Sequence, residues 1–110
     1  MEIIEKKQND ICIFKLIGRL DSNTAPDLEE KIFNAIEDGS KQMVVDFEDL
    51  DYISSAGLRV ILKTTKTLKR TEGKIILCSM QDYVREVFEI SGFDAFLPIT
   101  GRMDDALEKF

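Results

Sequence analysis

Short apolar runs alternate along the chain with segments of helical periodicity, and this alternation restricts the fold more than any other feature. Runs rich in apolar and β-branched residues predict strands at 2–7, 11–17, 43–47, 74–78 and 96–99. Helices are expected between Thr24 and Gly39, between Ser54 and Gly73, at 81–90 and at 103–110. The order β-β-α-β-α-β-α-β-α predicts an α/β fold, with a small mixed β-sheet and helices packed against it. The whole of residues 1–110 is expected to form one domain.

Polar and special residues set the expected ends of these elements. Asn9-Asp10 predicts a hairpin turn between the first two strands. Thr24 is a candidate N-cap for the first helix. The acidic segment 48–53 is expected to be an irregular connection into the second helix. Pro98 cannot donate a backbone hydrogen bond, which favours an edge position for the last strand.

The composition excludes several classes of function. The chain has no histidine, so neither a Ser-His nor a Cys-His nucleophile pair can form, and a metal site would lack its commonest ligand. We therefore expect a protein without enzymatic activity and without a metal or other cofactor. A Ser-Lys hydrolase remains an alternative, but Lys63 lies two helical turns beyond Ser55, too far along the axis for a direct pair.

Charge and apolar content indicate the surroundings of the protein. The net charge of −6 disfavours nucleic-acid binding. Residues 59–74 nevertheless carry six basic residues against one acidic residue, which is typical of a solvated helix face and alternatively of a surface for an acidic partner.

Cys12 and Cys78 each lie in an apolar run and are expected to be buried. No membrane-spanning run or secretory signal is visible, so we expect a cytoplasmic protein.

Two serines at the start of the second helix are the most informative feature for function. A helix N-terminus offers unpaired N–H groups and a partial positive charge, which suit a capping serine and also a phosphoserine. Small residues at Ala56 and Gly57 would leave the position open to a partner's backbone. From the residues alone, capping by Ser54 with no role for Ser55 and modification of Ser55 both remain open.

The run from Glu48 to Leu58 resembles the phosphorylation motif of the STAS family, named for sulfate transporters and anti-sigma factor antagonists. The phosphoacceptor of that motif, two residues before its glycine, aligns with Ser55. The likeness covers nearly the whole chain, because three further segments resemble the family's G-x-L-D segment, the strand before the motif and the end of the third helix. These segments are 18–25, 43–47 and 91–93.

The resemblance implies a bacterial anti-sigma factor antagonist. In such proteins the unmodified form binds an anti-sigma factor that is also a serine kinase, and thereby releases the sigma factor. Phosphorylation, here at Ser55, switches binding off, and a PP2C-type phosphatase restores it. A STAS subunit of a larger assembly without a serine switch, such as a lipid transporter or stress-signalling scaffold, is the alternative. The implied partner-binding residues are Asp21, Ser54, Ser55, Ala56, Gly57 and Arg59.

The motif departs from the family pattern at two positions. Ser54 stands where many members have aspartate, which puts a second hydroxyl beside the acceptor. Ala56 stands where others have serine, which removes a competing acceptor. Asp21 matches the family's loop aspartate, and an Asx-type turn before the first helix is an equally open interpretation of this residue.

Overall fold

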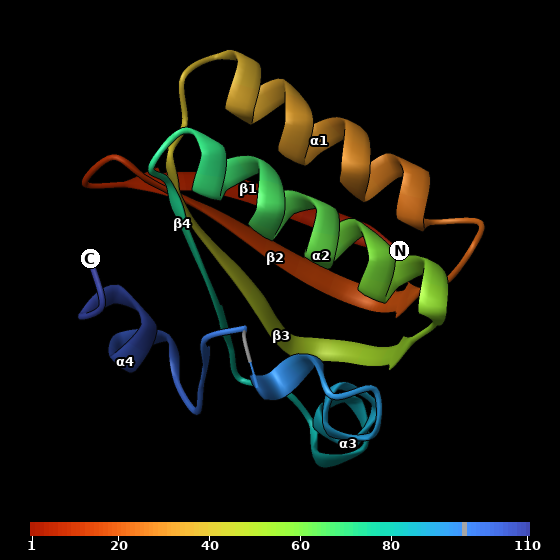
Figure 1. Cartoon of the computed structure of the whole chain (residues 1–110). Helices are drawn as coiled ribbons and strands as arrows, with labels where there is room; N and C mark the ends of the chain where they lie inside the picture. The colour runs from red at the N-terminus through yellow and green to blue at the C-terminus, as the bar shows by residue number, and fades with distance from the viewer. Residues whose placement is uncertain (96) are drawn as a thin grey trace.

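Five strands form one sheet in the order β1-β2-β3-β4-β5 in the computed structural model, which describes residues 1–95 and 97–110 (Figure 1). β1 runs antiparallel to β2, and the other neighbouring pairs are parallel. The strands are β1 Glu2–Gln8, β2 Ile11–Leu20, β3 Gln42–Ile53, β4 Lys74–Cys78 and β5 Ile99–Thr100. The helices are α1 Ala25–Glu37, α2 Ser55–Arg70, α3 Asp82–Ile90 and α4 Met103–Leu107, with a short 3-10 helix at Phe93–Ala95. The predicted α/β class and the predicted element order are confirmed.

The hairpin between β1 and β2 forms where the sequence predicts it. Gln8 pairs with Ile11, which leaves Asn9 and Asp10 as a two-residue turn. Both have positive φ, 52° and 67°, as the tight turns between antiparallel strands require. Asn and Asp tolerate this backbone region better than other residues with side chains, so the turn fixes the register of β1.

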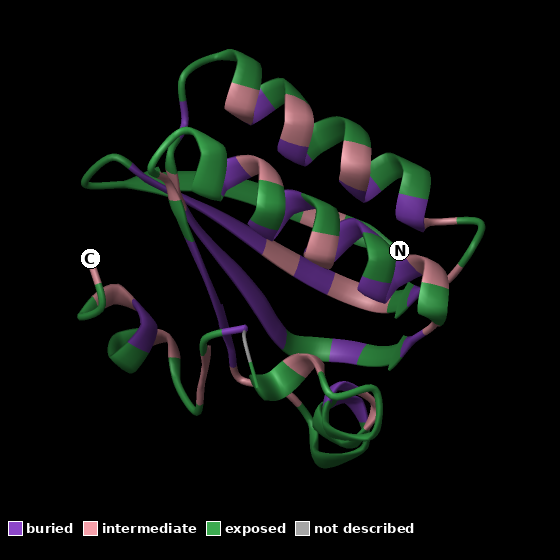
Figure 2. Ribbon diagram, viewed as in Figure 1, coloured by how far each residue is buried: buried purple, intermediate pink, exposed green. Residues whose placement is uncertain are grey.

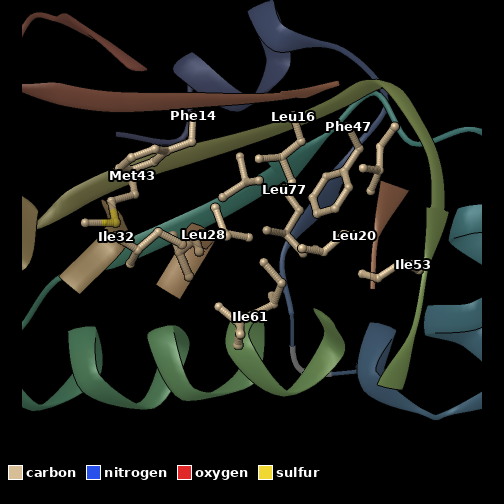
Figure 3. Packing of buried hydrophobic residues seen from close by; sticks show 14 of the residues in the cluster. Phe14, Leu16, Leu20, Leu28, Ile32, Met43, Phe47, Ile53, Ile61 and Leu77 are labelled. Carbon is tan, nitrogen blue, oxygen red and sulfur yellow. The ribbon is translucent and has the colours of Figure 1, made fainter. Parts of the chain in front are cut away.

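Helices α1 and α2 lie side by side over one face of the sheet and enclose most of the core (Figure 1). Buried residues occupy the centre of the strands and the inner sides of both helices (Figure 2). Leu28 and Ile32 of α1 and Ile61 of α2 reach into this layer (Figure 3). Burial of each such side chain stabilises the fold by about 1.5–3 kcal/mol. The amphipathic helices are therefore held in place by their apolar sides.

A smaller apolar cluster covers the opposite face of the sheet, where α4 packs (Figure 1). Ala106 of α4 is fully buried there, and Cys78 of β4 belongs to this cluster. Cys12 lies in the larger core under α1 and α2, so the two cysteines are on different faces. Both are free and buried, as predicted. Burial raises the pKa of each thiol to about 11.

Segment 48–53 is not an irregular connection, so that prediction is wrong. β3 continues through it and ends at Ile53, which pairs with Leu20 of β2. The β2–β3 ladder shifts register between Lys15 and Ile17 and again between Gly18 and Arg19. These irregularities interrupt the apolar alternation, so that this part of β3 resembles a polar loop in the sequence.

The C-terminal elements are shorter than the sequence predicts. The last strand is Ile99–Thr100 and not 96–99, and Phe96 lies outside the described residues. This strand is at the sheet edge, as Pro98 indicated, and α4 ends at Leu107. Within the described ranges, no helix has the length and apolar character needed to cross a bilayer.

Candidate functional site

The loop before α1 and the start of α2 meet where β2 and β3 end, because parallel strands bring their carboxyl ends to the same edge of the sheet. β2 ends at Leu20 and continues into the loop before α1, while β3 ends at Ile53 and leads directly into α2. The backbone N–H of Ser54 donates to the carbonyl of Leu20 at 2.9 Å. This hydrogen bond ties the start of α2 to the 21–24 loop.

The two serines have different environments at the N-terminus of α2. Ser54 is the N-cap, with extended backbone angles (φ −100°, ψ 175°), and its Oγ accepts from the N–H of Gly57 at 3.5 Å. Ser55 is the first helical residue and is exposed. Within residues 1–95 and 97–110, no hydrogen bond involves the Ser55 hydroxyl. Capping by Ser54 is confirmed, and the hydroxyl of Ser55 is exposed at the start of the helix.

Gly57 fills a packing role that the sequence did not indicate. A Cβ at this position would lie 2.7 Å from Cγ of Leu20 and 2.9 Å from Cγ1 of Ile53. Both contacts are shorter than van der Waals packing allows, so only glycine lets α2 approach the strand ends this closely. The sequence predicted that the small residue at Gly57 leaves the surface open to a partner's backbone. Gly57 is buried, so its small size serves packing inside the domain. Contact of Gly57 with a partner stays a prediction.

Asp21 organises the loop before α1. Its carboxylate accepts from the N–H of Asn23 at 2.9 Å and of Thr24 at 3.2 Å, which confirms the Asx-type turn. These N–H donors, that of Asn23 above all, lower the pKa of Asp21, and the charge of Arg19 lowers it further. Both N–H groups donate to the same oxygen, Oδ1, of the Asp21 carboxylate. The turn therefore fixes the loop near the start of α2.

Thr24 occupies the N-cap position of α1 but does not cap the helix, so that part of the prediction is wrong. Its backbone is already helical (φ −104°, ψ −22°), which turns the side chain away from the first N–H groups. The hydroxyl instead donates to the carbonyl of Arg19 at 2.8 Å and accepts from the N–H of Asp21 at 2.9 Å. Thr24 therefore closes the loop back onto the end of β2.

The basic side chains near the site are used in different ways. Lys63 pairs with Glu29 of α1 at 3.3 Å, and its Nζ lies 5.1 Å from the ring centre of Phe33. The ammonium of Lys63 thus contacts α1, and nothing in its described contacts supports a catalytic pair with Ser55. Arg59 is exposed one turn after Ser55, and in the part of the chain that the structure describes it forms no ion pair.

Arg19 and Tyr52 form a second feature of the same edge. They face each other on β2 and β3, and the guanidinium carbon lies 4.2 Å from the ring centre. Such a contact stabilises an exposed pair by about 0.5–1 kcal/mol. Over the described residues, no group of three His, Cys, Asp or Glu side chains is arranged to hold a metal ion.

The sequence resembles known proteins along its whole length. A family model described as STAS domain matches residues 2–106. The chain is 38% identical over 110 residues to BtrV of Bordetella bronchiseptica, which carries a provisional assignment as an anti-sigma factor antagonist; the match covers 100% of this chain and 95% of BtrV. It is 32% identical over 78 residues to the anti-sigma-B factor antagonist of Staphylococcus aureus, 71% of this chain and 72% of that protein.

Solved structures share the fold. A protein of Thermotoga maritima, provisionally assigned as an anti-sigma factor antagonist, superposes with a TM-score of 0.93 at 21% identity, over 97% of this chain and 92% of the other. The Bacillus cell fate determinant SpoIIAA, solved in its phosphorylated form, superposes with a TM-score of 0.77 at 23% identity, over 98% of each chain. At these identities the superpositions support the fold.

Proposed function

The chain belongs to the STAS family, and we propose that it is an anti-sigma factor antagonist whose binding is switched off by phosphorylation of Ser55. The proposal draws on BtrV and on the staphylococcal antagonist, whose names state this role for those proteins. The protein acts by binding and not by catalysis. Its partner is an anti-sigma factor that is also a serine kinase, and a PP2C-type phosphatase reverses the modification in the cytoplasm.

The separate environments of the two serines carry this proposal. Ser54 is occupied as the N-cap, whereas the hydroxyl of Ser55 is exposed and unbonded. A kinase that modified Ser54 would have to remove the cap, but modification of Ser55 leaves the cap in place. The structure of SpoIIAA in a phosphorylated form agrees with a fold of this kind that tolerates the modification.

The position of Ser55 favours a local effect. A phosphate there meets the N–H groups of the first turn of α2, where a negative charge is stabilised by about 0.3–1 kcal/mol. Arg59, one turn further along, can form a charge-assisted hydrogen bond with it. The domain therefore keeps its shape, while its contact surface gains a dianion that a closely packed partner would have to desolvate.

Capture from a native lysate tests the proposed function. Ser55→Ala and Ser55→Asp serve as parallel baits, with Ser54→Ala as the matched control for loss of a neighbouring hydroxyl. We expect Ser55→Ala and Ser54→Ala to retain an anti-sigma factor kinase and Ser55→Asp to lose it, since the added carboxylate mimics part of the phosphate charge. Peptide mapping after incubation with that kinase and ATP should place the phosphate on Ser55.

Two results would contradict the proposal. One is a phosphate on Ser54 or Thr24 with Ser55 unmodified. The other is recovery of the same partner in the same amount by the Ser55→Asp bait.

A further inference from the structure

We propose that the groove between α1 and α2, beside Ser55, binds a segment of the anti-sigma factor that presents an apolar side chain next to a carboxylate. This inference rests on the proposed function and adds the chemistry of the partner's contact. It is carried by the shape of the groove, by its uncompensated charge and by its position relative to Ser55.

The groove lies between the N-terminal halves of the two helices, which start at the same end of the sheet (Figure 1). Its volume is about 320 Å³, enough for a few side chains of a partner. Small apolar residues form much of its lining, and basic and acidic side chains from the two helices flank them. The lining residues are Ser22, Ala25, Pro26, Glu29, Ala56, Arg59, Val60 and Lys63. The small residues leave room for an apolar side chain that would lose its contact with water.

The charge of the groove favours an acidic partner. The carboxylate of Glu29 and the ammonium of Lys63 lie 3.3 Å apart and compensate each other across the two helices. Arg59 on the same rim is exposed and has no ion-pair partner anywhere in residues 1–95 and 97–110. One positive charge therefore remains at the groove of a chain whose net charge is −6. A carboxylate of the partner, placed beside its apolar side chain, can accept two hydrogen bonds from the guanidinium of Arg59.

The same arginine connects the groove to the modification. Ala56 of the lining follows Ser55 in the chain, and Arg59 lies four residues after Ser55, which is one turn of α2. A phosphate on Ser55 would compete with the partner's carboxylate for Arg59. Phosphorylation then removes the charge that the segment needs and adds a charge that repels it.

Paired charge removals on α2 test this proposal with the anti-sigma factor recovered by the Ser55→Ala bait. Arg59→Gln removes the charge at the groove. Lys66→Gln is the matched control, because Lys66 is exposed on the same helix but lies outside the lining. By calorimetry, we expect Arg59→Gln to raise the Kd about tenfold and Lys66→Gln to change the Kd by less than about twofold. Equal effects of the two variants would overturn the groove as the acidic contact.

A second probe does not depend on the role in sigma-factor regulation. It is a short synthetic helix with leucines on one side and adjacent glutamates, compared with a version in which glutamine replaces glutamate. In NMR titrations the methyl signals of Ala25, Ala56 and Val60 should shift with the glutamate helix and much less with the glutamine helix. Shifts elsewhere, or equal shifts with both helices, would contradict the proposed chemistry. Failure of the capture experiment alone refutes the antagonist role, whereas failure here refutes the groove.

Discussion

Replacing Gly57 with alanine should destabilise the domain, although alanine is the better helix former. Within a helix interior, alanine is favoured over glycine by about 0.8–1 kcal/mol, and less in the first turn. The added Cβ, however, would lie 2.7 Å from Cγ of Leu20 and 2.9 Å from Cγ1 of Ile53. Leu20 is fully buried and Ile53 nearly so, and the contacted Cγ and Cγ1 atoms each lie only two bonds from Cα, close to the backbone. Relief of the clash therefore requires α2 to move away from the strand ends.

The balance of the two effects sets the expected size of the change. Overpacking of a well-filled core costs about 1–3 kcal/mol. After subtraction of the helix preference, we expect Gly57→Ala to lower the free energy of unfolding by about 0.5–2 kcal/mol. For a domain of this size, that corresponds to a fall in Tm of about 2–10 °C.

Urea unfolding followed by circular dichroism measures this difference directly. Gly101→Ala is the matched control, because Gly101 is exposed and no atom lies within 4 Å of a Cβ built there. The control should unfold within about 0.5 kcal/mol of the wild type. A Gly57→Ala protein as stable as the wild type, or more stable, would refute the packing argument and leave helix propensity as the dominant effect.

Three further predictions follow from the same geometry. Ser54→Ala should lower the free energy of unfolding by about 0.5–1 kcal/mol through loss of the N-cap, while Ser55→Ala should change it by less; equal stabilities in urea would contradict separate roles. Burial raises the pKa values of Cys12 and Cys78 to about 11, so both thiols should react with a thiol reagent at neutral pH far more slowly in the native protein than in urea. Equal reaction rates in the two conditions would contradict the burial of the thiols. The Asp21 carboxyl should titrate by NMR below the usual aspartate range, because loop N–H groups donate to it and lower its pKa. The contribution of the Asp21 carboxylate to stability is present above its pKa in the unfolded chain and is lost as the pH falls through the lower native pKa. Asp21→Asn should therefore reduce the fall in the free energy of unfolding at acid pH. An unshifted titration of Asp21 would contradict the Asx turn.

Local signals made the element order and the N-cap readable from the sequence. Asn9-Asp10 favours positive φ, and the structure has a two-residue turn there. Ser54 follows a buried strand residue and precedes an amphipathic segment, which is sufficient to indicate a cap. Features of this kind depend on residues within one turn or one hairpin, so tertiary contacts do not override them.

The remaining features depend on contacts between distant segments. The extension of β3 to Ile53 follows from its pairing with β2 through two register shifts, each of which places one extra residue on β3, and no local pattern encodes this pairing. The need for glycine at Gly57 arises from Leu20, thirty-seven positions earlier in the chain. In both cases a residue far along the chain decides which local preference is realised. Thr24 differs, because its hydroxyl bonds to Arg19 and Asp21, only five and three positions earlier, and these contacts replace the cap that its residue type indicated.

The most direct test of the account compares the affinity of the anti-sigma factor for the unmodified protein and for protein that carries phosphoserine at Ser55. We predict a loss of affinity of about 100-fold or more on phosphorylation, equivalent to about 2.7 kcal/mol, because the dianion enters a close contact. Amide NMR shifts between the two forms should be confined to 19–24 and 52–60, since the phosphate lies at the exposed start of α2. Equal affinities, with the phosphate on Ser55 verified by mass spectrometry, would contradict the switch. Shifts spread over β3 and β4 with a large fall in Tm would show instead that the modification acts by unfolding.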